Sequence, residues 1–253
     1  MKNGKIYAIM IAIAFLVALV FSCVFLFSVS RVRTVYSVYS ESDVSEIQKS
    51  LDAFNGKNIF FVSENDIRSA VSDYTRFKVV SVDKSYPNVI NVNIEERREV
   101  YRFSYEGVVY CMDETGFIID TATEFSEDRD IIAIEFDGIE IISAKLGEVL
   151  ETSEKGFFLS VLEMAKYANL TDCIKSVTFR DDKSVEIKEV VFQTYTGVKI
   201  IVDKPDVRGL DKMIKAFDVY DNVTVDYYKT FSQILVIEQA TGEITATWEN
   251  PKG

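Results

Sequence analysis

The sequence predicts an α+β fold that follows an N-terminal transmembrane helix. Three observations support this class: an uncharged apolar run at residues 6–29, helical and strand-like segments that alternate over residues 30–99, and a remainder dominated by strands. We therefore expect a small domain of β-α-α-β-β order. A β-rich domain with helices packed on an antiparallel sheet is expected to follow it.

The apolar run at residues 6–29 contains no charged residue and no proline. About 20 apolar residues, at roughly 1.5 Å per residue, cross a hydrocarbon core of about 30 Å. A cleaved secretory signal has a shorter apolar region of about 7–15 residues. The tetrad Val20-Phe21-Ser22-Cys23 leaves a lipid anchor on Cys23 as another alternative, although the bulky Phe21 fits a processing site poorly.

We favour a retained transmembrane helix over residues 6–29. Residues 1–5 then form a short cytoplasmic tail, because only five residues precede the run and more than two hundred follow it. Long domains cross a membrane largely regardless of their charge. The expected localisation is the cell membrane, with a single pass and an extracytoplasmic C-terminal part.

The composition excludes several classes of function. The chain carries 40 acidic and 28 basic residues, a net charge of −12, and this disfavours nucleic-acid binding. It contains no histidine, which removes the commonest general base and metal ligand. Cys111 and Cys173 either pair or remain free thiols, and the lone Asp181-Asp182 pair is typical of a solvated loop. We predict no catalytic, cofactor-binding or metal-binding residue and no small-molecule substrate.

The first elements after the apolar run have recognisable start signals. Residues 31–40 are rich in Val, Tyr and Thr and predict a strand. Asp43 and Glu46 form a capping box for one helix, and Ser63 with Asp66 gives a second capping signal. Between these helices lies an apolar linker, residues 58–62, that we expect to fill the core.

Two strands close this first domain. The segment 77–83 predicts a strand, and the sequence Tyr86-Pro87-Asn88 predicts a turn because proline presets the backbone there. Residues 90–95 then alternate strictly between apolar and polar side chains, as in a strand with one buried face.

This order, together with three local sequences, resembles a POTRA domain of the FtsQ/DivIB family of bacterial division proteins. The shared pieces are the Gly56–Phe60 linker, the Tyr-Pro-Asn turn and the closing Ile94–Arg98 sequence. The family usually has a proline where this chain has Arg98-Glu99. The resemblance implies a POTRA domain at 30–99, a β domain at 100–238 and a C-terminal tail at 239–253.

The β domain is predicted from short apolar segments and two helical patterns. We expect helices at 153–168 and around Leu210–Phe217, and strands at 100–103, 108–112, 117–119, 131–136, 174–179, 190–195 and 198–202. Asp113-Glu114-Thr115-Gly116 superficially resembles an aspartic-protease motif. The chain has no second copy to supply the paired carboxylate, so we interpret the tetrad as a turn.

The segment 231–238 predicts a terminal strand whose centre, Ile234–Ile237, is apolar on both faces. Such a strand is either central and covered, or it accepts a partner's strand by β-augmentation. The resemblance favours the second interpretation, because in the family this strand and the nearby helix receive FtsB/DivIC-like and FtsL-like partners. The predicted partner-binding residues are Tyr228, Lys229, Phe231, Gln233, Ile234, Leu235, Val236 and Ile237. Residues 244–248 are expected to form an extra strand or tail near the same edge.

The favoured function is a non-enzymatic scaffold that supports septum formation at the division site. A membrane-tethered cell-wall enzyme would need a nucleophile with a base or two converging carboxylates, and the sequence offers neither pattern. The alternative is a membrane-anchored, POTRA-containing assembly or sensor protein outside division.

Overall fold

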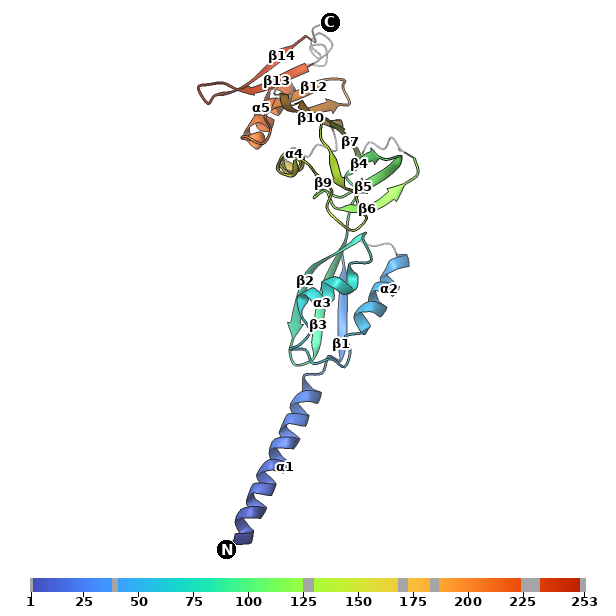
Figure 1. Cartoon of the computed structure of the whole chain (residues 1–253), viewed down its shortest axis with the longest axis vertical. Coiled ribbons are helices and arrows are strands. Elements are labelled where there is room, and N and C mark those ends of the chain that lie inside the picture. The colour runs from blue at the N-terminus through green and yellow to red at the C-terminus, as the bar shows by residue number, and fades with distance from the viewer. Residues whose placement is uncertain are drawn as a thin grey trace. The chain divides into compact units, whose positions relative to one another are not determined.

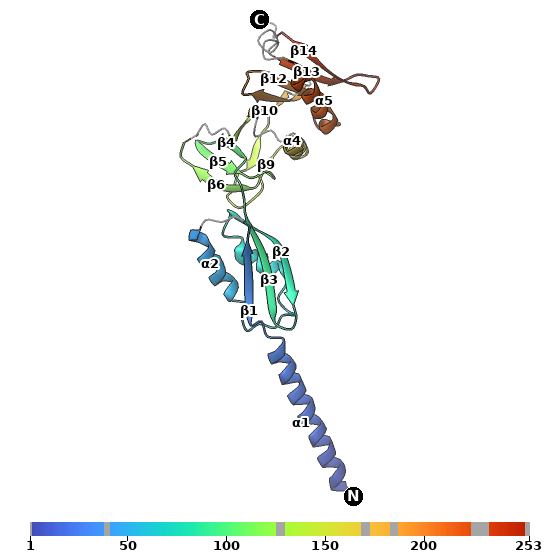
Figure 2. The same ribbon diagram turned by 180° about the vertical axis from the view of Figure 1, so that it is seen from behind.

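The computed structural model describes residues 2–37, 41–124, 130–167, 173–182, 187–223 and 233–250; the side chains of 2–9, 41–43, 167 and 187 are not described. The chain divides into two compact units, Met1–Arg97 and Arg98–Gly253. Figures 1 and 2 show the ribbon from opposite sides. Each unit is described by itself below.

Unit 1 contains a long helix and then the predicted β-α-α-β-β order, which is confirmed. Its three strands pair in the order β1-β3-β2, with β1 parallel and β2 antiparallel to β3. The elements are α1 (Lys2–Leu26), β1 (Arg31–Tyr36), α2 (Glu41–Asp52), α3 (Glu64–Val71), β2 (Phe77–Ser85) and β3 (Val89–Glu96).

The first helix differs from the predicted span at both ends. It begins at Lys2 and ends at Leu26, whereas the apolar run continues to Val29. Val29 instead packs in the core of unit 1 at 2% exposure, and its amide donates a hydrogen bond to the Lys57 carbonyl oxygen. Among the described residues, no helix is both long and apolar enough to qualify as a membrane span, so the span over 6–29 is not confirmed.

Local signals explain much of unit 1. Ser63 caps α3, and its hydroxyl and the Asp66 carboxylate form the reciprocal bonds of a capping box. Helix α2 begins at Glu41, two residues before the predicted cap at Asp43. The apolar side chains that alternate along β3, namely Ile90, Val92 and Ile94, are fully buried as predicted.

Unit 2 is built on a mixed sheet of nine strands in the order β14-β13-β12-β11-β10-β7-β4-β5-β6. A separate two-stranded sheet joins β8 and β9. The elements are β4 (Tyr101–Tyr105), β5 (Val108–Met112), β6 (Ile118–Ala122), β7 (Ile132–Asp137), β8 (Ile141–Ser143), β9 (Glu151–Thr152), α4 (Lys155–Tyr167), β10 (Ile174–Asp182), β11 (Ile187–Thr194), β12 (Lys199–Asp203), α5 (Gly209–Asp221), β13 (Gln233–Glu238) and β14 (Ile244–Glu249).

The prediction of an antiparallel sheet was wrong in part. Strand β7 runs parallel to both β4 and β10, and β12 runs parallel to β13. For the β7–β10 and β12–β13 pairs, the physical reason is that α4 lies between β7 and β10 in the chain, and α5 lies between β12 and β13. A helix in the connection returns the chain to the same end of the sheet, which makes the next strand parallel.

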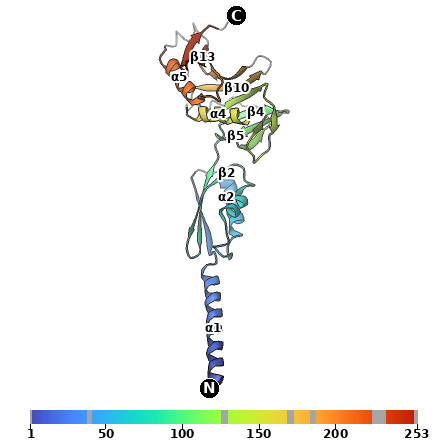
Figure 3. The same ribbon diagram turned by 60° about the vertical axis from the view of Figure 1, so that its left-hand side comes forward.

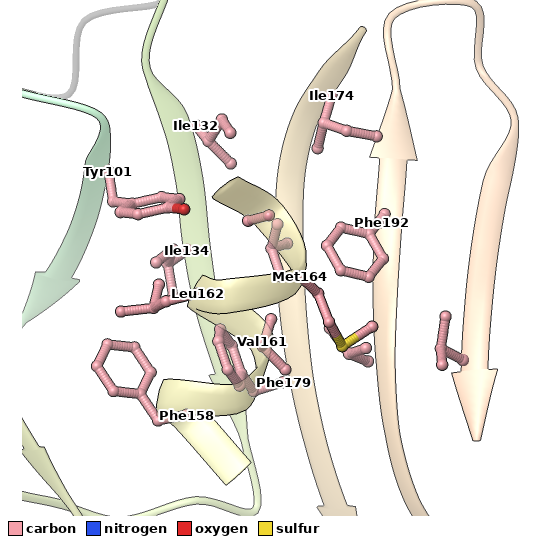
Figure 4. Close-up of a cluster of buried hydrophobic side chains, with 14 of the residues drawn as sticks. Tyr101, Ile132, Ile134, Phe158, Val161, Leu162, Met164, Ile174, Phe179 and Phe192 are labelled. Atoms are coloured by element: carbon pink, nitrogen blue, oxygen red, sulfur yellow. The ribbon is translucent and has the colours of Figure 1, made fainter. Parts of the chain in front are cut away.

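The core of unit 2 lies between helices α4 and α5 on one side and one face of the sheet on the other. Figure 4 shows Phe158, Val161, Leu162 and Met164 of α4 directed at the side chains of the strands. The strand residues that meet them are Tyr101, Ile132, Ile134, Ile174, Phe179 and Phe192, all at most 4% exposed. Helix α5 packs beside α4 and against β12, β13 and β14 (Figure 3).

The outer edge at β6 is partly covered by the chain that follows β8. The amide of Ile118 donates to the Glu148 carbonyl oxygen at 2.9 Å, and the Gly147 amide donates to the Ile118 carbonyl oxygen at 2.9 Å. Phe117 and Val149 form an isolated antiparallel bridge. This cover occupies backbone groups that β6 otherwise presents at its edge.

Candidate partner-binding edge

The strand predicted to accept a partner is not at the edge of the sheet. Strand β13 pairs with β12 on one side, in parallel register from Lys199↔Gln233, and with β14 on the other, in antiparallel register from Gln233↔Glu249. Its backbone groups are therefore used on both sides. The prediction of β-augmentation on this strand is corrected by this pairing.

The side chains of β13 alternate between the core and the opposite face of the sheet. Ile234 and Val236 are fully buried, and they pack in the core that α5 covers. Leu235 and Ile237 face the other way and are half-buried. A run that is apolar on both faces thus reflects a central strand, which is the first of the two interpretations that the sequence left open.

The other predicted binding residues divide into two groups. Gln233 starts β13, and its side-chain amide donates to the Glu249 carboxylate at 3.2 Å. Tyr228, Lys229 and Phe231 lie outside the described residues. Partner binding by any of these side chains stays a prediction.

The exposed edge belongs to β14, which the sequence suggested only as an extra strand. A tight hairpin joins it to β13: the Gly242 amide donates to the Gln239 carbonyl oxygen at 2.8 Å, and the Gln239 amide to the Glu243 carbonyl oxygen at 2.8 Å. Gly242 has a φ of 82°, as in a three-residue loop with a bulge at its last position. The register then continues without a shift to Gln233↔Glu249.

This hairpin geometry fixes which backbone groups of β14 point outward. Hydrogen-bonded and non-hydrogen-bonded pairs alternate along an antiparallel ladder. Since Gln239 and Glu243 are hydrogen-bonded, the pairs that follow place the N–H and C=O groups of Ile244, Ala246 and Trp248 away from β13. Their side chains pack against the core of unit 2.

An arginine connects the hairpin to the start of α5. The Arg208 guanidinium donates to the Gly242 carbonyl oxygen at 2.9 Å and to Glu238 at 3.4 Å. It also donates to the Asp211 carboxylate at 3.0 Å, and this bond, with the neighbouring charges, raises the pKa of Arg208. The edge hairpin and α5 are therefore held in one arrangement.

A buried lysine holds the other side of the same helix. Lys212 is 1% exposed, and its ammonium group donates to the carbonyl oxygens of Asp203 at 2.8 Å and Lys204 at 3.0 Å. Burial lowers the pKa of Lys212. These bonds join the end of β12 to α5, and they position the helix that covers β13 and β14.

Other polar clusters in unit 2 include a group of ion pairs on the sheet and a hydrogen-bonded turn. Arg180 lies between Asp137, at 3.1 Å, and Glu189, at 2.6 Å, with its pKa raised by these bonds and charges despite partial burial. Asp113 is buried in its turn and accepts bonds from the Thr115 amide and hydroxyl and from the Phe117 amide. These bonds account for the tetrad as a turn.

No group of three or more His, Cys, Asp or Glu residues is placed to hold a metal ion within the described ranges. Cys111 and Cys173 do not form a disulfide bond, so of the two possibilities that the sequence left, the structure has the two thiols rather than the bond.

Comparison with known proteins identifies the type of the first domain. Residues 39–97 match the family model for the POTRA domain of the FtsQ type. Two curated relatives are each named cell division protein DivIB. The protein of Clostridium tetani is 23% identical over 177 residues, 68% of this chain and 63% of its own length. That of Clostridium acetobutylicum is 20% identical over 151 residues, 60% of this chain and 57% of its own length.

These matches span about three fifths of the length of the relatives. Among solved structures, the major extracytoplasmic domain of DivIB from Geobacillus stearothermophilus matches 51% of this chain and 98% of its own, with 12% identity and a TM-score of 0.31. The resemblance to the FtsQ/DivIB family is confirmed, and it is carried most specifically by the FtsQ-type POTRA domain of residues 39–97.

Proposed function

We propose that this protein is a non-enzymatic cell division scaffold whose β domain binds a partner by strand addition at β14. The observation that supports it most is the outermost position of β14 in the nine-stranded sheet. An outer strand presents a row of backbone donors and acceptors that a partner's strand can use. The names of the two DivIB relatives support a role in division.

The partners in this proposal are the outer segments of FtsB/DivIC-like and FtsL-like single-span proteins. Strand addition takes most of its affinity from main-chain hydrogen bonds. The six residues of β14 offer outward groups at three positions, Ile244, Ala246 and Trp248. The proposed docking strand is therefore β14, the C-terminal neighbour of β13, on which the sequence had placed the site.

Anchoring at the membrane by residues 6–29 is part of the same proposal. Its support is the uncharged apolar sequence and the exposed apolar side chains of α1 from Met10 to Leu26, with Ile11 and Phe15 each 69% exposed. Resistance of the full chain to extraction by alkaline carbonate, and release by detergent, tests this part.

Proline scanning of β14 tests the docking edge. Ala246→Pro removes an outward N–H and leaves the ladder to β13 complete, because edge strands accept proline where the N–H faces solvent. We expect at least about tenfold weaker binding, since one lost hydrogen bond and the clash with an added strand exceed about 1.4 kcal/mol. The measurement is binding of the full chain in detergent to the partners' outer segments.

Two variants control this experiment. Ala246→Ser keeps the N–H and is expected to bind normally. Thr247→Pro removes a bond to β13 and is expected to lower the stability of the hairpin, measured by amide exchange of β13. Normal binding by a folded Ala246→Pro variant would place the partner elsewhere.

A further inference from the structure

Unit 1 carries three aromatic side chains in ring contact and a fourth that follows one of them in the chain, and three of the four are exposed. We define the aromatic patch as Phe27, Phe60, Phe61 and Tyr86. The ring of Phe60 lies 4.9 Å from that of Phe27 and 5.4 Å from that of Tyr86. Phe60, Phe61 and Tyr86 are 55%, 86% and 58% exposed.

Phe27 is partly buried against the core of unit 1, but the rings of Phe60, Phe61 and Tyr86 are not part of that core. The predicted core-filling linker at residues 58–62 is buried only at Ile59 and Val62, and Phe60 and Phe61 point outward. Both are held in that position by a turn: the Phe60 amide donates to the Asn58 side chain at 3.0 Å, and the Phe61 amide donates to the Asn58 carbonyl oxygen at 3.0 Å. The exposure is therefore a fixed feature of the turn.

The aromatic patch continues the apolar surface of α1 without a break. The Phe27 amide donates to the Cys23 carbonyl oxygen at 3.0 Å, and the Ile59 amide donates to the Phe27 carbonyl oxygen at 2.8 Å. Phe25, just before the helix ends, is 76% exposed. Phe27, the first residue after the helix, thus belongs to the patch itself, and no linker separates the patch from α1.

We propose that the aromatic patch inserts into the interfacial region of the membrane that α1 enters. This inference rests on the proposed anchoring. If α1 fills the hydrocarbon core, Phe27 stands where the core ends. The interfacial layer beyond it is about 5–7 Å deep on each side. The Phe60 ring, 4.9 Å from Phe27, lies within that depth.

The chemistry of the patch fits lipid. Aromatic side chains concentrate at the level of the headgroups, where an apolar ring is buried and a polar tip such as the Tyr86 hydroxyl remains wet. Lys57 lies beside this segment, since the Lys57 carbonyl oxygen accepts from the Val29 amide, and its ammonium group lies over the Phe54 ring at 4.4 Å from the ring centroid. Insertion would hold the POTRA domain close to the bilayer surface.

A tryptophan reporter tests the insertion. The full chain is reconstituted into phosphatidylcholine vesicles after Trp248→Phe removes its only tryptophan and Phe61→Trp introduces another. With lipid brominated near the top of its acyl chains, we expect the emission at position 61 to fall by about a factor of two. The matched control is Val80→Trp, at a position 54% exposed on β2 of the same unit and roughly 20 Å along the strand from Tyr86. We expect no quenching there.

Vesicle flotation separates this inference from the anchoring on which it rests. A chain that does not float with the vesicles overturns both. A chain that floats, with an emission at position 61 that bromine does not quench, overturns the insertion alone. A blue-shifted but unquenched emission also overturns it, because a protein would then cover the patch.

Discussion

Gly138 offers the sharpest test of the sheet that carries the proposed edge. It follows β7 with a φ of 76°, and a methyl group added there would overlap the Asp181 carbonyl oxygen and lie 3.0 Å from its carbonyl carbon. Both obstacles are backbone atoms of β10, the parallel neighbour of β7. Gly138→Ala therefore requires the two strands to separate at this end.

The magnitude follows from two contributions. A non-glycine residue in the left-handed region costs about 1–2 kcal/mol. Displacing a packed strand adds a cost of the size that overpacking produces, about 1–3 kcal/mol. We expect Gly138→Ala to lower the free energy of unfolding of unit 2 by about 2–5 kcal/mol.

Gly107 provides the matched control. Its φ of 79° is nearly the same, and a methyl group there meets no atom within 4 Å. Gly107→Ala is expected to cost only the backbone contribution, about 1–2 kcal/mol. The assay is urea unfolding of the full chain in detergent, followed through Trp248, which is the only tryptophan and packs against the core of unit 2. Equal losses for the two variants would refute the close approach of β7 and β10.

Three further predictions concern the cores and one cap. Burial raises the pKa of Cys111 from 9.0 to about 11, so the stability that its protonated thiol contributes is complete below pH 9 and is lost as the pH rises toward 11. In urea unfolding at alkaline pH, Cys111→Ser should therefore remove up to about 3 kcal/mol of the fall in unfolding free energy between pH 9 and pH 11. An unchanged dependence of the unfolding free energy on pH would contradict this prediction. Val236→Ala should cost about 2–3 kcal/mol by the same Trp248 assay, because it opens a cavity under α5; a loss below about 1 kcal/mol would indicate an exposed strand. Ser63→Ala should destabilise α3 by about 1 kcal/mol, measured by amide exchange. It should also raise the depressed pKa of Asp66, measured by NMR titration, because hydrogen bonds from Ser63 are the largest cause of that depression. An unchanged Asp66 pKa would exclude the capping box.

The sequence was most informative where the determining contacts are local. Ser63 and Asp66 lie three residues apart, and the alternation along β3 is complete within one strand, so both features were predicted correctly. The same local signals predicted the element order of the whole first domain, and that order was one of the grounds for its resemblance to FtsQ-type POTRA domains.

Sequence patterns could not identify the neighbours of β13 in the sheet. The apolar run Ile234–Ile237 is the same whether a strand is central or awaits a partner, and only the return of the chain through the Gly242 hairpin decides between them. The prediction that the linker at 58–62 fills the core was wrong in part for a related reason. Its apolar residues look equivalent in sequence, but the turn at Asn58 directs Phe60 and Phe61 away from the core. Both outcomes depend on backbone geometry that hydrophobicity does not encode.

The unequal covering of the two outer strands has a consequence for stoichiometry. The Gly147–Leu150 segment already occupies backbone groups at the start of β6, and the described part of the chain places no such segment along β14. The start of β6 is therefore less open to strand addition than β14 is. For the scaffold proposed above, we expect one added strand per molecule, at β14, and the occupied groups at the start of β6 oppose edge-to-edge stacking of copies of the chain.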